Sequence, residues 1–409
     1  MDYIKLLREE YPIIGLGVLL TFFSSFGQTF LISLYLPEFL EHFQITEGQY
    51  GTYYAIATVS SAACLLYVGK LLDRTDLLYY TLMVCAGMIV ACLILASANH
   101  WIVLIVGIWG LRLSGQGLMS HISMTTMGRY FEFNRGKAVS VASMGHALGE
   151  FAFPVAITAI ITGFGWRSSL MMSAGFVLLV LVPIVFLILY SRKKVRTPPD
   201  HEAEPDKDQV EEKWNYGRML RDRRFWVLVP SVFIKGFLIT ALFFFQVSIA
   251  DFMEWSREWM AGCIMAFAIF QILASLLGGP MIDKWSARIL FPFHLLPLAF
   301  GVSMLLLWGH PYIGIIYFGL MGISMGFGNT VKSAAYAELF GTRSLGLVRS
   351  LFTVVMVFST ALGPVIFGWL LDFDVSFFYI FLTSILVVLL IAVTSFPVQK
   401  MSRPNTPQP

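Results

Sequence analysis

Four charged side chains lie deep inside long apolar runs of this chain, and they are the first candidates for chemistry. Arg112, Lys235 and Lys332 are cations, whereas Glu150 is the only acid placed in this way. A charge at the centre of a bilayer costs about 2.5–3.5 kcal/mol, so each one retained in such surroundings needs a reason. An interior with surplus positive charge attracts anions and disfavours cations.

Arg112 has the side chain best suited to bind a carboxylate. Its guanidinium can hold both carboxylate oxygens through two parallel hydrogen bonds. An α-helix through this run turns by about 100° per residue, which predicts Gln116, Met119 and Ser123 on the same face as Arg112. The alternative is a structural role, in which Arg112 pairs with Glu150.

The other two cations differ in depth. Lys235 lies in the middle of its apolar run, whereas Lys332, beside Asn329, either lines a cavity or extends its ammonium to the membrane surface. Gln28 lies on the polar face of the first apolar run, where it binds a substrate or contacts a neighbouring helix. The predicted substrate-binding residues are Arg112, Gln116, Lys235, Gln28, Asn329 and Lys332.

Glu150 and His146 are the candidates for handling a proton. They lie one helical turn apart on the same face, and a carboxyl in apolar surroundings binds protons more readily unless a cation offsets the effect. Gly145 and Gly149 support a second interpretation, because two small residues four apart let helices pack closely. In that case Glu150 only satisfies Arg112 beside the contact.

Composition places the chain in a membrane. It has 409 residues, of which 57% are hydrophobic and only 13% are charged, whereas a soluble domain carries about 25% charged residues. The net charge of +3 is too small to indicate a nucleic-acid partner. The four cysteines lie in apolar runs, which predicts reduced, buried thiols.

Nothing in the sequence indicates an enzyme. The sequence has no recognisable nucleophile–base pair and no phosphate-binding loop. Its seven histidines are not spaced as metal ligands, so neither a cofactor nor a metal is expected. A signal peptide is also not expected, because the first apolar run is too long for one.

Twelve membrane-spanning helices are predicted, because a span needs about 20 mostly apolar residues. We number them as spans 1 to 12, at residues 12–36, 50–70, 78–98, 101–128, 137–161, 168–190, 225–249, 258–280, 289–308, 311–337, 347–369 and 376–397. With the N-terminus in the cytoplasm, every Lys and Arg outside the spans falls on the cytoplasmic side except Arg167 and Arg257. This asymmetry predicts that both termini are cytoplasmic. The membrane is expected to be the cytoplasmic (inner) membrane.

A charged, proline-containing segment divides the spans into six and six, and its composition predicts a flexible linker. The predicted organisation is an N-terminal six-helix bundle at 1–190, a cytoplasmic linker at 191–224, a C-terminal bundle at 225–397 and a disordered tail at 398–409.

The two halves repeat a short motif about 210 residues apart. Gly69, Asp73 and Arg74 follow span 2, and Gly279, Asp283 and Lys284 follow span 8, with the same spacing within each set. A repeat of six spans around a central linker is the layout of a secondary transporter.

The motif from Gly69 to Arg74 resembles the signature loop of the major facilitator superfamily. The resemblance implies an all-α fold of two pseudo-symmetric bundles, a cavity lined by spans 1, 4, 7 and 10, and a protein that works as a monomer. It also implies that Asp73 and Asp283 bind neighbouring helix ends and act as a conformational latch, with Gly69, Arg74, Gly279 and Lys284 in the same motifs.

Within the superfamily, two stretches are similar to monocarboxylate and oxalate/formate-type porters. They are Arg129-Tyr130-Phe131 through Arg135-Gly136-Lys137-Ala138, and Met219-Leu220-Arg221 through Arg224-Phe225-Trp226. Because three cations and only one acid lie inside the spans, the favoured function is transport of a small organic anion, a carboxylate, coupled to protons. The run from Gly145 to Pro154 also resembles a motif of drug/proton antiporters, so a proton-driven exporter of hydrophobic compounds is the alternative.

Overall fold

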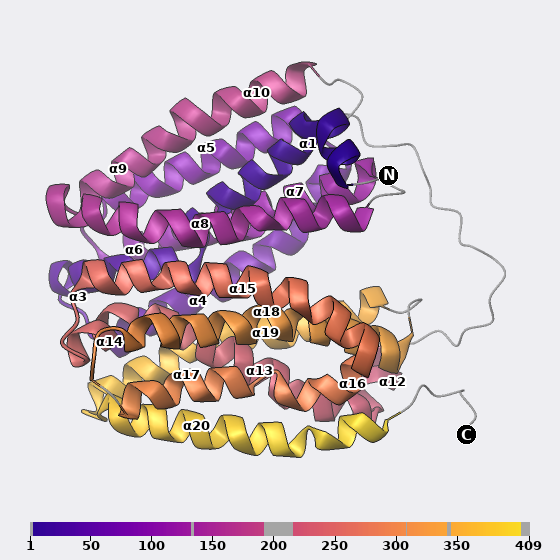
Figure 1. Cartoon of the computed structure of the whole chain (residues 1–409). Coiled ribbons are helices and arrows are strands. Elements are labelled where there is room, and N and C mark those ends of the chain that lie inside the picture. Colours follow the sequence, from indigo (N-terminus) through magenta and orange to yellow (C-terminus); the bar gives the residue numbers. More distant parts are fainter. Residues whose placement is uncertain (1–2, 132–134, 192–215, 308, 342–344, 402–409) are drawn as a thin grey trace. The chain divides into compact units, whose positions relative to one another are not determined.

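The computed structural model describes residues 3–131, 135–191, 216–307, 309–341 and 345–401. Every regular element within these residues is a helix (Figure 1). Within the described part of the chain, twelve helical segments are long and apolar enough to cross a membrane, from Glu10–Gly27 to Phe377–Lys400. The expected number of spans is therefore confirmed, and the ends agree with the predicted ones to within a few residues except at spans 1, 7 and 8.

The described residues form two compact units. The first contains the described residues up to 191 together with Phe243–Ser248, and the second contains those of 216–242 and 249–401. Most of the predicted linker, and residues 402–409 of the predicted tail, lie outside the described residues. The short helix α12 (Tyr216–Arg221) falls within the predicted linker, and the 3-10 turn Phe396–Lys400 extends from the last predicted span into the predicted tail.

The helices of the first unit are α1 (Tyr3–Phe23), α2 (Thr29–Ile32), α3 (Leu36–Phe43), α4 (Glu47–Val68), α5 (Leu77–Ala96), α6 (Trp101–Leu111), α7 (Ser120–Tyr130), α8 (Arg135–Phe164), α9 (Trp166–Phe176) and α10 (Val182–Ser191). Shorter elements join some of them: η1 (Ser24–Gly27), η2 (Ser33–Tyr35), η3 (Gly69–Asp73), η4 (Arg112–Met119) and η5 (Val177–Leu181).

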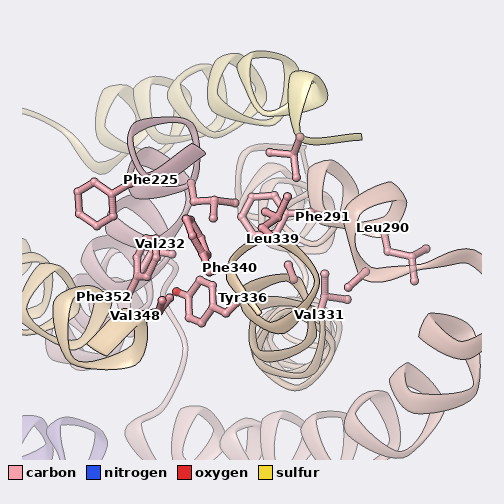
Figure 2. Close-up of a cluster of buried hydrophobic side chains, with 14 of the residues drawn as sticks. Phe225, Val232, Leu290, Phe291, Val331, Tyr336, Leu339, Phe340, Val348 and Phe352 are labelled. Atoms are coloured by element: carbon pink, nitrogen blue, oxygen red, sulfur yellow. The ribbon is translucent and has the colours of Figure 1, made fainter. Parts of the chain in front are cut away.

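After α12, the second unit contains α13 (Arg223–Phe244), α14 (Gln246–Phe252), α15 (Arg257–Trp285), α16 (Ala287–Leu290), η6 (Phe291–Phe293), α17 (Leu296–Leu307), α18 (Ile313–Phe340), α19 (Leu345–Asp372) and α20 (Phe377–Thr394). A cluster of buried apolar side chains packs α12, α13, α16, η6, α18 and α19 together (Figure 2). In this cluster the rings of Tyr336 and Phe352 stack with centroids 4.4 Å apart.

Span 1 is broken, although the sequence predicts one continuous helix. After α1 the chain passes through η1, a 3-10 turn, and Gln28 is extended at φ −85° and ψ 151° before α2 begins. The break lies against span 4, where backbones meet at two glycines: a Cβ on Gly27 would lie 2.6 Å from the Gln116 nitrogen, and one on Gly115 would lie 2.7 Å from the Gly27 nitrogen. Only residues without a Cβ permit this approach.

Span 4 is also irregular at this level. Arg112–Met119 is π-helical, an arrangement that appears mostly as short bulges and is frequent at functional sites. The predicted face at 100° per residue does not hold across a π-helix. Ser123 donates a hydrogen bond of 2.8 Å to the Gly17 carbonyl of α1, and Arg112 also contacts span 1, at Gly27 and Thr29.

Span 5 packs closely on span 1 through the two glycines noted in the sequence. A Cβ on Gly145 would collide with Thr21 Oγ1 and the Val18 carbonyl, and one on Gly149 would collide with Ser25 Oγ. Thr21 Oγ1 also donates to the Ala142 carbonyl at 2.5 Å. The close packing predicted from these small residues is therefore present.

We predict that Gly145→Val destabilises the protein, because the added carbons have no room between α1 and α8. Overpacking of this kind costs about 1–3 kcal/mol. The control is Gly163→Val on the same helix, where a Cβ would meet nothing within 4 Å. Thermal unfolding of the purified proteins in detergent checks this, and equal midpoints for the two variants would contradict it.

Candidate functional site

Arg112 is buried in the first unit and is held only by weak contacts. Its side chain is 4% exposed, and Nη1 lies 3.3 Å from the Gly27 carbonyl oxygen and 3.4 Å from Thr29 Oγ1. Both distances exceed the usual 2.7–3.2 Å for an N–H···O hydrogen bond. Its Nε is buried without a partner among the described residues.

Tyr54 and Thr29 complete the surroundings of the guanidinium. Tyr54 is fully buried on α4; its ring lies 5.1 Å from the Arg112 guanidinium carbon, and its hydroxyl lies 2.6 Å from Thr29 Oγ1. Sequence reasoning did not select either residue. Thr29 approaches Arg112 because span 1 breaks beside it, and no periodicity in the sequence signals that break.

The hydrogen bonds of Arg112 within the described residues all go to neutral oxygens. A guanidinium has five N–H donors, and burial without strong acceptors leaves it poorly compensated. These contacts do not include the pairing with Glu150 that the sequence offered as an alternative. Gln116 and Gln28 are partly buried beside the break, where the Gln116 backbone approaches Gly27.

Lys235 is the corresponding buried cation of the second unit. It is 5% exposed on α13, and its Nζ lies 3.1 Å from Asn329 Oδ1 and 3.2 Å from the Met325 carbonyl oxygen. The structure thus brings two predicted binding residues, Lys235 and Asn329, into direct contact. Lys332 is partly buried about one turn further along α18.

Gly328 makes room for Lys235. A Cβ there would lie 2.6 Å from Lys235 Nζ and 2.8 Å from His294 Cδ2, so the ammonium and the imidazole edge approach the same point. His294 is 2% exposed, and its Nδ1 lies 2.5 Å from the Phe291 carbonyl oxygen. Gly328 was not predicted, because a missing side chain leaves no chemical signal.

His146 and Glu150 lie on α8 beside the close contact with span 1. Ser24 Oγ lies 3.2 Å from His146 Nδ1, and both His146 and Glu150 are partly buried. The glycine contact and the two residues predicted to handle a proton therefore lie side by side on α8.

The motif after span 2 contains an ion pair. Gly69–Asp73 is a 3-10 turn, and the Asp73 carboxylate pairs with Arg129 at the end of α7. Arg74 is exposed. In the second half the helix continues through Gly279 and Asp283 to Trp285, so this copy of the motif is helical rather than a loop.

The second copy of the motif is supported by a different acid. Asp283 and Lys284 are exposed, and Glu338 of α18 instead binds Ser286 Oγ at 2.6 Å and the Ala287 nitrogen at 2.8 Å. Glu338 also pairs with Arg288 at 3.2 Å. Sequence reasoning missed Glu338, which lies about 210 residues after Arg129 and has the opposite charge.

The start of α13 is fixed to the end of α18. Arg224 pairs with Asp222 at 2.6 Å and donates to the Leu339 carbonyl at 2.9 Å. Burial alone raises the pKa of the Asp222 carboxyl, but the hydrogen bonds and charge of Arg224 outweigh burial and hold that pKa below its ordinary value.

Known proteins resemble this chain over nearly its whole length. The family model of the Major Facilitator Superfamily matches residues 17–270 and 259–408. Among solved structures, a bacterial homologue of the human lysosomal transporter Spinster, in an inward-facing and occupied conformation, is 13% identical and superposes with a TM-score of 0.75 over 95% of this chain and 96% of that one. A single-residue mutant of the nucleoside transporter NupG gives 0.72 at 11% identity over 94% of this chain and 99% of that one. At these identities the likeness shows the fold alone.

Two named relatives match at the sequence level. The oxalate:formate antiporter of Oxalobacter formigenes is 22% identical over 71% of this chain and 68% of that protein. Monocarboxylate transporter 12 of Mus musculus is 22% identical over 64% of this chain, which spans 59% of that protein. A 38 kDa protein of Thermoproteus tenax with no assigned function is 26% identical over 64% of this chain and 62% of that protein. The resemblance to oxalate/formate and monocarboxylate porters is thus confirmed.

We predict that Asp73→Asn and Arg129→Gln each slow transport while changing the unfolding midpoint little. The pair is partly exposed, with side chains 55% and 35% accessible, and such pairs stabilise by about 0–1 kcal/mol. The exchange Asp73→Arg with Arg129→Asp should restore part of the rate. Failure of the exchange, with both single variants as fast as the unaltered protein, would exclude a latch at this position.

Proposed function

The chain belongs to the major facilitator superfamily, a family of membrane transporters, and we propose that it moves a small organic anion by alternating access. The proposed substrate is a carboxylate, taken up through the cytoplasmic membrane together with a proton. The distribution of Lys and Arg supports an orientation with both termini in the cytoplasm.

The contacts of Arg112 support this proposal most strongly. The guanidinium is 4% exposed, makes only two long hydrogen bonds to neutral oxygens and has a buried Nε without a partner among the described residues. A carboxylate would supply two charged acceptors with the spacing of the guanidinium fork. Hydrogen bonds to charged groups stabilise by about 1.5–3 kcal/mol, so an anion replaces weak contacts with strong ones.

Tyr54 and Thr29 suit the same ligand. Their two hydroxyl groups share one hydrogen bond, so one of the two hydroxyl hydrogens is not used between them. A site with Arg112 N–H groups and a spare hydroxyl hydrogen has an excess of donors. Such an excess favours a ligand with several acceptors, as a carboxylate has. We include Gln116 and Gln28, which flank the break, in the proposed site.

Lys235 supports the proposal independently, from the second unit. Its ammonium contacts only the neutral Asn329 Oδ1 and Met325 oxygen within the described residues, and Lys332 adds a second cation on α18. Three donors and no matching acid favour an anionic ligand here too. The printed names of two relatives, an oxalate:formate antiporter and a monocarboxylate transporter, are consistent with that substrate class.

Proton coupling is proposed to use Glu150 and His146. Both are titratable groups within a spanning helix, where ionisable residues commonly form proton relays. Ser24 gives His146 a hydrogen-bond partner, and His146 and Glu150 lie one turn apart on α8.

We predict that Arg112→Ala and Lys235→Ala each lower the affinity for the transported anion by about 30-fold or more, because removing one partner of a buried charged contact costs about 2–5 kcal/mol. The assay is exchange of radiolabelled oxalate or formate by the purified protein in liposomes. Arg112→Lys should recover only part of the loss, since an ammonium lacks the planar fork. The exposed Arg349 provides the control Arg349→Ala.

Normal binding and exchange by both alanine variants would refute the anion site. A thermal-shift screen against a carboxylate library at two pH values extends the test to other substrates, since a ligand that binds the folded state raises its stability. If the protein instead exports hydrophobic compounds, a deletion strain should be more sensitive to drugs, and no carboxylate should stabilise the purified protein in the screen.

We also predict that Gly328→Ala weakens anion affinity about tenfold with little loss of stability, because the new methyl group displaces the Lys235 ammonium. Gly262→Ala is the matched control, since a Cβ there meets nothing within 4 Å. The half-saturation concentration for exchange distinguishes them. Equal values for the two variants would mean that the position of Lys235 does not affect binding.

A further inference from the structure

We propose that Ser24 positions His146 for proton transfer, by holding the neutral imidazole in the form with hydrogen on Nδ1 and leaving Nε2 as the proton acceptor. The inference rests on the proposed function, in which His146 carries a proton. It adds a residue that sequence reasoning did not select and fixes the ring atom at which the proton binds.

The single hydrogen of the Ser24 hydroxyl is already used. Ser24 Oγ lies 2.6 Å from the Thr21 carbonyl oxygen, and because a carbonyl can only accept, Ser24 is the donor. The oxygen of Ser24 can therefore only accept in its 3.2 Å contact with His146 Nδ1. It follows that Nδ1 carries a hydrogen. In a neutral imidazole the other nitrogen, Nε2, then has the lone pair.

Nε2 is available for a proton. No hydrogen bond joins it to another group among the described residues, and the side chain is partly rather than fully buried. A hydronium ion transfers its extra proton to the Nε2 lone pair and becomes a water molecule, and the resulting imidazolium still donates from Nδ1 to Ser24. Loss of the same proton restores the neutral ring, so one proton enters and one leaves while no other bond changes.

The frame that holds the two side chains together is stiff. Thr21 Oγ1 donates to the Ala142 carbonyl one turn before His146, and Gly145 and Gly149 bring the α8 backbone against α1 and η1 on either side of it. Ser24 itself is fully buried in η1. Close backbone packing thus keeps the hydroxyl oxygen opposite Nδ1, because neither helix can slide without a collision.

Few charged groups face His146. The elements packed on α8 are α1, α2, α7, α9, η1 and η2. Among the spanning residues of α1, η1, α2 and η2, Glu10 and Tyr11 lie at the start of the span, and the only titratable side chain from Ile13 to Tyr35 is that of Tyr35. The α7 helix contributes His121 and, at its end, Arg129 and Tyr130, and α9 contributes Arg167 near its start. Within α8 itself, Glu150 follows one turn later and is the acid able to stabilise an imidazolium there.

The first experiment reads the tautomer directly. Protein labelled with ¹⁵N-histidine is examined by NMR at a pH where His146 is neutral, and its signals are identified among the seven histidines by their loss in His146→Asn. A protonated ring nitrogen and one with a lone pair have different ¹⁵N shifts. We expect hydrogen on Nδ1 in the unaltered protein and in Ser24→Thr, and a mixture of tautomers in Ser24→Ala. Hydrogen on Nε2 in the unaltered protein would overturn the inference, whatever the transport result.

The second experiment measures transport with oxalate and formate as probes, in liposomes that contain a pH-sensitive dye. For Ser24→Ala we expect proton-linked net uptake to fall about tenfold and its pH profile to shift, while exchange of the same anion at equal pH is unchanged. Ser24→Thr should restore net uptake. Ser25→Ala is the control, because Ser25 is an adjacent, fully buried serine whose hydroxyl has no partner among the described residues.

The outcomes separate the two proposals. Absence of anion exchange by the unaltered protein for every anion tested would refute the proposed function and leave the tautomer result standing. Anion exchange with no difference between Ser24→Ala and Ser25→Ala in pH profile or net uptake would refute the role of Ser24 and leave the proposed function intact. If Ser24→Ala fails to fold, the tautomer of the unaltered protein and the behaviour of Ser24→Thr still decide the question.

Discussion

Within the apolar interior of a membrane protein, every buried N–H and C=O group needs a partner, and this requirement organises the first unit around Arg112. The break in span 1 frees the Gly27 carbonyl from helical bonding, and the Arg112 guanidinium occupies the space beside it at 3.3 Å. The irregular backbone of span 1 and the buried charge of span 4 partly compensate each other. Because the contacts are long and neutral, the compensation is incomplete, and the proposal of an anionic ligand rests on this incompleteness.

The two units meet the same requirement with different chemistry. Lys235 is held by the Asn329 side-chain amide and the Met325 carbonyl of α18, which is a continuous helix. Arg112, in contrast, lies beside the break in span 1. Near the ends of the helices, Asp73 pairs with Arg129 in the first unit, whereas Glu338 binds Ser286 and Arg288 in the second. Arg129 on span 4 and Glu338 on span 10 lie about 210 residues apart in the sequence, and each takes part in an ion pair, although their charges are opposite. The repeat preserves where polar contacts form more than which residues form them.

At three glycines of this protein, close packing also sets the position of a polar side chain. Gly145 and Gly149 bring α8 against α1, and the same approach places His146 within reach of Ser24. Gly328 similarly leaves room for the Lys235 ammonium beside His294. In each case a missing side chain sets the position of a polar one, because helices without a Cβ at the contact approach until other atoms touch.

The sequence by itself determined the membrane setting, the twelve spans, the family motif and the four charges inside the spans. Each of these follows from local composition or spacing: apolar length fixes a span, and a charge within it is visible in the sequence alone. The tertiary structure alone decided which groups those charges contact. The break at Gln28, the π-helical turn after Arg112 and the partners Thr29, Tyr54 and Ser24 depend on how closely neighbouring helices approach, and that approach is set by side chains far apart in the chain.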